Sequence, residues 1–323
     1  MRTLLGLAAA AVAALVFVQA GAPAAPAHSV AIFYYPWYGT PAQDGSYEHW
    51  SQNGHTPPGD LYSAFYPALG AYSSTNQRVL GRQMAEIATA GVDEVIASWW
   101  GRGSETDLRL TAVLRAARRR GLAVAAHIEP YGGRTPETVA ADVAYLSGLG
   151  IGDVYVYRAE DDPAAAWAAV RGSMPPVRLF AQTAHAGFAA AAAFDGIYTY
   201  DILTYDGDKF VRLCDQARRL RLLCAPSVGP GYDATRAGEV AALKSRRAGA
   251  TYDAMWTAAL DAQPDLVTIT SYNEWGEGTQ IEPARTARGY RNYDGAWGLR
   301  GPAASSAYLA RTAYWAARFH DLR

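Results

Sequence analysis

Two glutamates near the C-terminal end of this 323-residue chain lie close enough in sequence to act together as an acid and a base. Glu274 and Glu277 lie in a glycine-containing turn directly after a β-branched run, residues 267–270. Such a run predicts a buried strand, and carboxylates at its end need partners because an unpaired buried charge is costly. Polar side chains gathered in a loop on a rigid strand indicate a functional site more often than a packing feature. The structural alternative is a solvated turn with a hydrogen-bonded Asn273.

The pair fits the hydrolysis of a glycosidic bond, in which one acid protonates the leaving oxygen and a second group acts as nucleophile or base. Because only two residues separate Glu274 from Glu277, their carboxyl groups can approach the roughly 5 Å spacing of a retaining glycosidase. Two close carboxyl groups also push their pKa values apart, which provides an acid and a base at one pH. Glu129 is a third candidate, as acid, base or acceptor for a sugar hydroxyl. We expect a structural or substrate-positioning role for Glu282.

Composition and motifs narrow the other classes of function. The net charge is −1, so the chain lacks the basic footprint that nucleic-acid binding requires. The 21 tyrosines and 9 tryptophans suit sugar faces, but they also suit an ordinary core. Neither a Gly-x-Ser-x-Gly elbow nor a His-Glu-x-x-His motif is present. His127 and Glu129 could ligate a metal, but a hydrogen-bonded histidine at a strand end is the more common arrangement. We therefore expect neither metal nor cofactor.

Strands and helices alternate along the chain from residue 30 onwards, which predicts a parallel sheet covered by helices. The predicted strands are 30–35, 92–99, 122–128, 153–157, 177–182, 196–200, 222–228 and 265–270. The predicted helices are 76–90, 106–120, 136–149, 163–171, 187–193, 209–220, 251–262 and 305–319. Eight such units predict a single-domain (β/α)8 barrel over residues 28–323, since roughly 250 residues plus insertions is usual for that fold. A doubly wound open sheet is the alternative, but no glycine-rich phosphate fingerprint follows any strand.

In a (β/α)8 barrel the active site lies at the C-terminal ends of the strands, so the residues there are the candidate substrate-binding groups. The long loop 37–75 is rich in aromatic residues and is expected to be functional rather than disordered. The substrate-binding candidates are Tyr35, Trp37, Trp99, Trp100, His127, Glu129, Tyr131, Tyr200, Asn273 and Trp275.

The first 27 residues have the pattern of a secretory signal peptide. Arg2 precedes an apolar run, and the segment ends in small residues up to Ala27. The run is short for a membrane span of about 20 residues, so we predict cleavage after Ala27, a secreted or extracytoplasmic product and no stable membrane span. An uncleaved anchor is the alternative.

Cys214 and Cys224 are the two cysteines, and export would permit a disulfide between them. Cys214 is expected in the middle of a helix and Cys224 in the next strand. Helix and sheet layers usually lie about 10 Å apart, which exceeds the Cα separation of a disulfide. We therefore expect two buried thiols.

The run Thr-Ser-Tyr-Asn-Glu-Trp-Gly-Glu-Gly-Thr-Gln-Ile-Glu at 270–282 resembles the signature of glycoside hydrolase family 99, which comprises endo-α-mannosidases and endo-α-1,2-mannanases. Stretches 33–39, 97–101, 127–131, 196–200 and 226–232 agree with the same family. The resemblance implies a barrel and a metal-free retaining mechanism through a 1,2-anhydro sugar. Glu274 would be the base for the sugar 2-hydroxyl and Glu277 the acid/base. Trp99 would be a stacking platform and Glu129 would hold sugar hydroxyls.

Two departures bear on the substrate. Mannose-acting members of this family carry histidine where this chain has Gly276, and a Tyr-Asp-Ser-Tyr run where it reads Tyr-Arg-Ala-Glu at 157–160. We expect an endo-acting α-glycosidase, acting as a monomer on an oligosaccharide or polysaccharide of α-mannosides. The alternatives are the same barrel acting on an α-glucan, and a non-catalytic glycan-binding protein.

Overall fold

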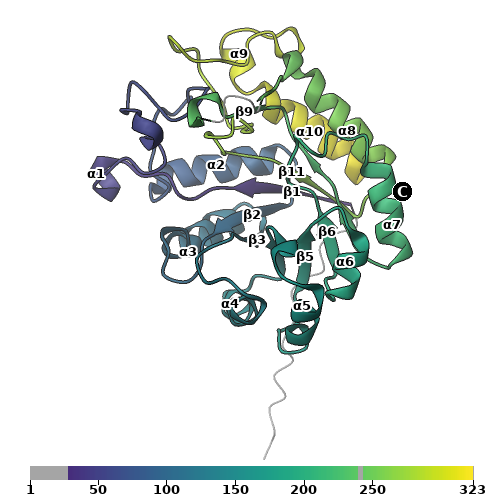
Figure 1. Ribbon diagram of the computed structural model, residues 1–323. Coiled ribbons are helices and arrows are strands. Elements are labelled where there is room, and N and C mark those ends of the chain that lie inside the picture. The colour runs from purple at the N-terminus through teal and green to yellow at the C-terminus, as the bar shows by residue number, and fades with distance from the viewer. Residues whose placement is uncertain (1–27, 239–242, 323) are drawn as a thin grey trace, which may run out of the picture.

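A computed structural model describes residues 28–238 and 243–322 as a nearly closed, parallel α/β barrel (Figure 1). Nine strands pair in the order β7-β6-β5-β4-β3-β2-β1-β11-β8, and every pairing in this sheet is parallel. The strands are β1 (Ser29–Tyr34), β2 (Glu94–Trp99), β3 (Ala123–Ile128), β4 (Asp153–Val156), β5 (Arg178–Gln182), β6 (Gly196–Tyr198), β7 (Leu223–Ala225), β8 (Ser227–Val228) and β11 (Leu266–Ile269).

Pro226 divides the predicted seventh strand into two pieces. β7 pairs with β6, whereas β8 pairs with β11, so one interrupted strand closes the ring. Proline cannot donate a ladder hydrogen bond, which explains why the strand changes partner there. The predicted barrel of eight strand–helix units is therefore confirmed, and the alternative of an open doubly wound sheet is wrong.

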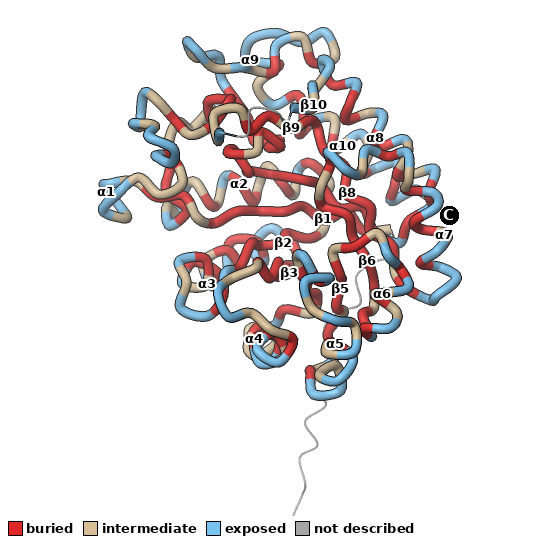
Figure 2. Tube along the Cα trace, viewed as in Figure 1, coloured by how far each residue is buried: buried red, intermediate tan, exposed pale blue. Residues whose placement is uncertain are grey.

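The covering helices follow the strands in the predicted alternation. They are α2 (Gln77–Thr89), α3 (Glu105–Arg118), α4 (Pro136–Gly148), α5 (Ala164–Arg171), α6 (Ala186–Ala191), α7 (Phe210–Arg219), α8 (Ala250–Asp261) and α10 (Ala307–His320). Side-chain caps explain several starts: the Asn76 side chain accepts from two backbone N–H groups of α2, and Ser104 caps α3. The strands are buried while the helices expose their outer faces (Figure 2).

Three insertions follow the C-terminal ends of strands and form that face of the barrel. The 37–75 loop contains α1 (Pro41–Asp44) and is ordered by Arg109 of α3. The Arg109 guanidinium donates to Pro36 O at 3.1 Å and contacts Asp44 and Glu48. A second insertion follows β8 and forms a two-stranded ribbon, β9 (Tyr232–Asp233) with β10 (Leu243–Lys244). The third follows β11 and includes α9 (Pro302–Ser305).

No helix in residues 28–238 or 243–322 is long and apolar enough to cross a membrane. The predicted signal peptide, residues 1–27, lies outside the described residues.

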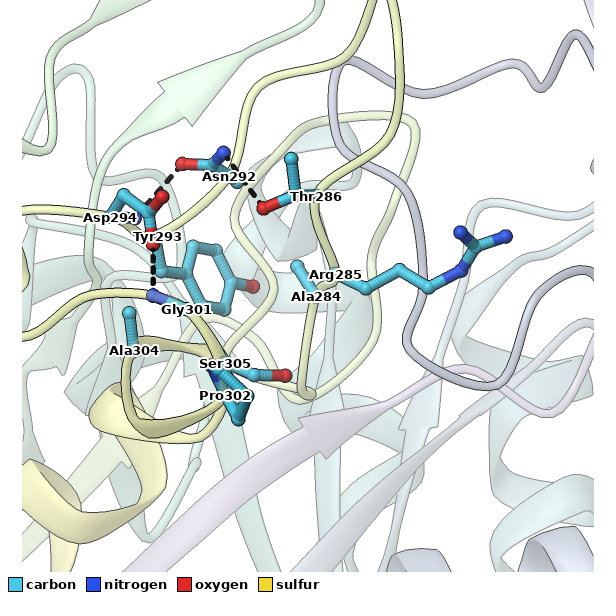
Figure 3. A pocket seen from close by; sticks show the side chains of 10 residues that line it. All are labelled: Ala284, Arg285, Thr286, Asn292, Tyr293, Asp294, Gly301, Pro302, Ala304 and Ser305. Atoms are coloured by element: carbon cyan, nitrogen blue, oxygen red, sulfur yellow. Dashed lines mark hydrogen bonds between the residues drawn. The ribbon is translucent and has the colours of Figure 1, made fainter.

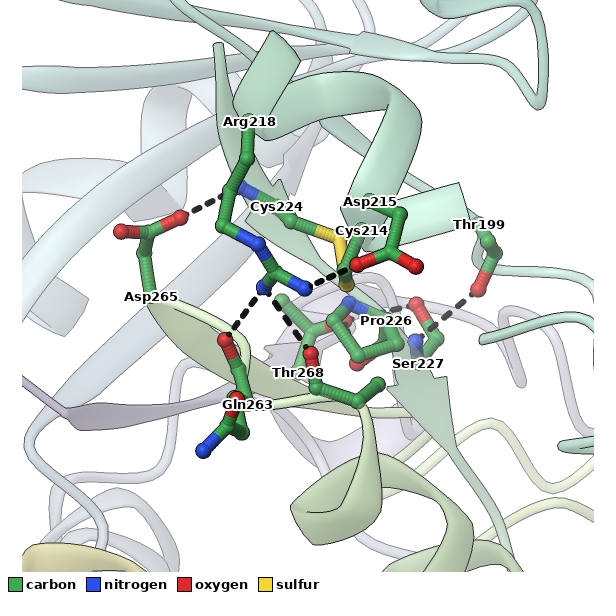
Figure 4. The surroundings of a disulfide bond; sticks show 11 residues. Thr199, Cys214, Asp215, Arg218, Cys224, Pro226, Ser227, Gln263, Asp265 and Thr268 are labelled. Atoms are coloured by element: carbon green, nitrogen blue, oxygen red, sulfur yellow. Dashed lines mark hydrogen bonds and ion pairs between the residues drawn. A yellow bond between two sulfur atoms is a disulfide. The ribbon is translucent and has the colours of Figure 1, made fainter. Parts of the chain in front are cut away.

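The prediction of two free thiols is wrong, because Cys214 and Cys224 form a disulfide (Figure 4). Their Cα atoms are 5.3 Å apart, although Cys214 lies in α7 and Cys224 in β7. A spacing of about 10 Å describes the centres of packed layers. The Cα atoms on the inner side of a helix lie about 2.3 Å closer to the sheet than the helix axis does.

Replacing both cysteines by alanine should lower the free energy of unfolding by about 2–3 kcal/mol, because the bond closes a loop with a sequence separation of 10 residues. Urea unfolding with and without reductant measures this effect. Reductant should destabilise the wild type and leave the double variant unchanged. Equal stability of the two proteins without reductant would show that the bond does not form in solution.

Candidate active site

The segment 271–282, which we name the catalytic loop, folds back on itself directly after β11. Ser271 N donates to Thr279 O at 3.0 Å, and the two side-chain hydroxyls are 2.9 Å apart. Ser271 Oγ in turn accepts from Glu274 N at 2.8 Å. These contacts fix both ends of the turn that carries Glu274 and Glu277.

Asn273 joins the catalytic loop to the end of β1. Its Oδ1 accepts from Tyr35 N at 2.7 Å, and its Nδ2 donates to Tyr35 O at 3.0 Å. Tyr38 OH donates to Asn273 O at 2.9 Å and accepts from Trp275 N at 3.1 Å. Asn273 and Trp275 are fully buried. Both were predicted to bind substrate, but in this structure Asn273 ties the loop to the end of β1 and Trp275 ties it to the 37–75 loop through Tyr38.

Glu282, the last residue of the catalytic loop, is the buried centre of a hydrogen-bond network. Its carboxylate accepts from Tyr72 OH, Trp275 Nε1 and Gln83 Nε2, each at 2.8 Å. Burial raises the pKa of Glu282 to about 7, while these three donors limit the rise. Of the two roles expected for Glu282, these contacts support the structural one. Tyr72 and Gln83 carry no sequence signal that pairs them with residue 282.

Glu274 and Glu277 occupy neighbouring but different environments. Glu274 is buried, and its Oε1 accepts from Gly276 N at 3.0 Å and from Glu277 N at 3.4 Å. Burial, followed by the charge of Glu277, holds the pKa of Glu274 well above its ordinary value. Glu277 is only half-buried, and its Oε2 accepts from Tyr200 OH at 3.3 Å. The two carboxylates are thus electrostatically coupled and unequally exposed, which is the arrangement that acid–base catalysis uses.

Two tyrosine hydroxyls are hydrogen-bonded in a chain to this pair. Tyr200 OH is hydrogen-bonded to Tyr35 OH as well as to Glu277. Burial and the nearby carboxylates, Glu129 for Tyr35 and Glu277 for both, raise the pKa of each phenol well above its ordinary value. Both tyrosines therefore stay neutral and can donate hydrogen bonds at the site.

Glu129 lies on the same side of the barrel, at the end of β3. Its Oε1 accepts from Ser98 Oγ at 2.8 Å and lies 3.0 Å from His127 Nδ1, at ion-pair distance but off hydrogen-bond alignment. His127 Nε2 is hydrogen-bonded to Tyr198 OH at 2.8 Å. The histidine at this strand end is therefore buried and hydrogen-bonded, and no group of three potential metal ligands occurs among the described residues.

The aromatic candidates divide into exposed and buried rings. Trp37 is half-buried, 4.7 Å from the Tyr35 ring, and stacks on His49 at 4.3 Å. Trp100 is 38% exposed and presents its ring to solvent. Trp99 is fully buried, and its Nε1 donates to Asp107 at 2.8 Å. A sugar could stack on Trp99 only after side chains rearrange, so that role stays a prediction.

Tyr131 follows β3 at the barrel rim and is half-buried. Its hydroxyl donates to Asp142 in α4, and its ring meets Trp99 edge to face with centroids 6.2 Å apart. Burial, followed by the bond to Asp142, raises the pKa of Tyr131 to about 12. The Tyr131 hydroxyl is thus committed to α4, while part of its ring remains accessible.

Tyr62 is a residue of the site that sequence reasoning missed. A Cβ atom at Gly276 would lie 2.7 Å from Tyr62 Cε1 and 3.1 Å from Glu274 Oε1. Tyr62 therefore fills the space that a side chain at 276 would need. The contact joins the 37–75 loop to the catalytic loop, and no local pattern in the sequence reveals it.

Gly276→Ala should lower the free energy of unfolding by about 1–3 kcal/mol, because the added methyl group overpacks this contact. The same change in a Tyr62→Ala background should cost less, since the ring that it meets is gone. Urea unfolding of the two single variants and the double variant measures the difference. Strictly additive effects would show that Tyr62 does not occupy this space.

A separate hollow of about 380 Å³ lies between the 284–294 segment and α9 (Figure 3). Two hydrogen bonds join polar groups of its lining. Asn292 Nδ2 donates to Thr286 Oγ1 at 3.2 Å, and Gly301 N donates to Asp294 Oδ1 at 2.7 Å. The hollow is not lined by Glu274 or Glu277, so we assign it no part in the chemistry.

Comparison with known proteins identifies the family of this chain. The model of the family described as Glycosyl hydrolase family 99 matches residues 26–164 and 174–321. The chain is 31% identical over 368 residues to a glycoprotein endo-alpha-1,2-mannosidase-like protein of Danio rerio, covering 94% of this chain and 81% of that protein. It is 31% identical over 352 residues to the glycoprotein endo-alpha-1,2-mannosidase of Rattus norvegicus, covering 90% and 75%. The GH99 endo-alpha-mannosidase structure from Bacteroides thetaiotaomicron has a TM-score of 0.81 at 29% identity, covering 90% and 97%. The chain belongs to glycosyl hydrolase family 99.

Proposed function

We propose that this glycoside hydrolase is secreted and cleaves internal bonds of α-mannoside chains with retention of configuration. The coupling of Glu274 and Glu277 on one turn at the mouth of the barrel is the observation that carries the proposal. Relatives named endo-α-mannosidases support the choice of sugar. The leader-like residues 1–27 support export.

The reaction we propose uses the sugar's own 2-hydroxyl as the nucleophile. Glu274 takes the hydroxyl proton while O2 attacks C1, so the C1–O2 bond forms and the bond from C1 to the leaving oxygen breaks. Glu277 gives its proton to that oxygen. In the second step Glu277 takes a proton from water, the water oxygen bonds to C1, the C1–O2 bond breaks, and Glu274 returns its proton to O2. One water is consumed and both glutamates regain their starting states.

The unequal burial of the two carboxylates fits a pair that shares one proton. A raised pKa makes Glu274 a stronger base once it is ionised. When Glu277 carries the proton, its repulsion of Glu274 disappears, which favours ionised Glu274. We therefore expect a bell-shaped pH dependence of kcat/KM. Each of its two apparent pKa values describes the coupled pair and not one glutamate alone.

The direct test is a panel of α-1,2-, α-1,3- and α-1,6-linked mannans beside α-glucans, with the products separated by size. We expect oligosaccharides of several units from an α-mannan and no early release of monosaccharide. Glu277→Gln is the control for contaminating activity. Cleavage of α-glucan alone would refute the mannoside assignment, while tight binding without products would indicate a glycan-binding protein.

A further inference from the structure

We propose that Arg246 is a positioning residue, which sets the catalytic geometry by holding the backbone directly after Glu277. The inference rests on the proposed function of the Glu274–Glu277 pair. Arg246 Nη2 donates to Gly278 O at 3.0 Å and to Gln280 O at 2.6 Å. Gly278 follows Glu277 directly, so one guanidinium group fixes two carbonyls of the catalytic loop.

Three aromatic rings from distant segments enclose the Arg246 guanidinium. Its Cζ atom lies 4.6 Å from the Phe65 ring centre, 4.8 Å from Tyr293 and 4.7 Å from Tyr308. These rings belong to the 37–75 loop, to the segment after the catalytic loop and to α10. The cage holds the cation in place through the negative faces of the rings.

Ordinary packing does not explain a cation in this place. Asp233, a carboxylate of the same insertion, pairs with Arg291. Within residues 28–238 and 243–322, the Nε and Nη1 atoms of Arg246 are buried without a hydrogen-bond partner. Burying guanidinium N–H groups without hydrogen-bond partners is costly, so packing alone would favour an apolar side chain inside the ring cage. The guanidinium group makes two hydrogen bonds to the catalytic loop, which an apolar side chain could not make.

The neighbouring residues show that the insertion after β8 is fitted to the catalytic loop. Asp233 N donates to Glu277 O at 2.7 Å, and Arg246 donates to Gly278 O. The insertion therefore holds the carbonyl groups of both Glu277 and Gly278. A Cβ atom at Gly278 would lie 2.8 Å from Asp233 O, and one at Gly231 would lie 2.8 Å from Arg246 Cγ. Glycine at both positions allows this close approach. Through these contacts Arg246 sets where the Glu277 carboxylate stands relative to Glu274 and Tyr200.

Arg246→Met tests the proposal, because methionine keeps much of the apolar stem and loses both bonds. We expect kcat on the α-mannan to fall about 100-fold while KM changes by less than about threefold, since a small displacement of a catalytic group is costly to the reaction step. Arg246→Lys keeps the charge but lacks the planar fork, and should give an intermediate kcat. Arg285→Met is the matched control, because Arg285 also lies over a tyrosine ring, Tyr66 at 4.3 Å, but among the described residues its side chain donates to no carbonyl of the catalytic loop.

A second readout needs no substrate. Carbon-13 NMR of glutamate-labelled protein, assigned with Glu274→Gln and Glu277→Gln, follows the carboxyl titrations of the pair. Arg246→Met should bring the two apparent pKa values closer together, because a freed Glu277 repels Glu274 less; Arg285→Met should leave them unchanged. If Arg246→Met does not fold, Arg246→Lys is measured in the same way.

The outcomes separate the two proposals. The role of Arg246 would be overturned if the difference between the two apparent pKa values persists in Arg246→Met. It would also be overturned if Arg285→Met reduces that difference equally, even when the wild type is active. A separation that depends on Arg246 in a protein that cleaves no α-mannoside would support the positioning role and refute the proposed function.

Discussion

Glu274→Gln should lower kcat by about 10³- to 10⁴-fold on every glycoside, whatever its leaving group. The amide cannot accept the proton of the 2-hydroxyl, so attack on C1 loses its base. The substitution keeps the shape of the side chain, and the carbonyl oxygen can still accept from the N–H groups of Gly276 and Glu277. Steady-state kinetics on an α-mannan and on a substrate with a fluoride leaving group measures the loss.

Stability provides the control for this variant. Because burial raises the pKa of Glu274, this carboxyl group loses its proton at a lower pH in the unfolded chain than in the folded protein. The stability of the wild type therefore falls as the pH rises above the ordinary pKa of a glutamate. Glu274→Gln should therefore unfold at a higher temperature than the wild type at pH 8, with a smaller advantage at pH 5. The exposed Glu137 in α4 offers a matched Glu→Gln change that should leave kcat unaltered. Near-normal activity of Glu274→Gln would contradict its role as base.

Glu277→Gln should show a loss that depends on the leaving group. On an oligosaccharide, kcat should fall by about 10²- to 10⁴-fold, because no acid protonates the departing oxygen. Fluoride leaves without a proton, so formation of the intermediate from a glycosyl fluoride should be nearly normal. Hydrolysis of that intermediate still lacks its base, and azide, which needs no base, should restore turnover. Single-turnover and azide-rescue kinetics measure the two steps separately.

The same experiment decides which carboxylate is the acid. The burial of Glu274 favours its protonated form in the free enzyme, which is also the form that an acid needs. If Glu274→Gln proves to depend on the leaving group and Glu277→Gln does not, the roles are reversed and attack through the 2-hydroxyl must use Glu277. If the activity of neither variant depends on the leaving group, the result would contradict a mechanism with two carboxylates in separate roles.

The alternation of short apolar runs with helical segments was enough to predict the barrel, because each run lacks a polar face and must be covered on both sides. It did not predict the division at Pro226, since both pieces read as one apolar strand. The cysteine pair was misjudged because an average spacing between layer centres was applied to two Cα atoms on the facing sides of α7 and β7.

Within the site, the strand-end rule located Glu129, Tyr35 and Tyr200, because parallel strands bring their C-terminal ends to one edge. It also selected Asn273 and Trp275, but Asn273 bonds to Tyr35 at the end of β1, and Trp275 bonds to Tyr38 and Glu282. Tyr62 and Arg246 were missed because they reach the catalytic loop from long insertions. Contacts of this kind depend on how loops pack in three dimensions, and no periodic pattern records them.

Time-resolved proton NMR of the hydrolysis of a linear α-1,2-mannooligosaccharide tests whether the Glu274–Glu277 pair is a retaining α-mannosidase centre. Wild-type protein should cleave an internal bond, and the new reducing end should form first as the α-anomer, before mutarotation. Neither Glu274→Gln nor Glu277→Gln should match that rate. A β-anomer formed first, or no cleavage by the wild type, would contradict the assignment of this pair as a retaining α-mannosidase centre.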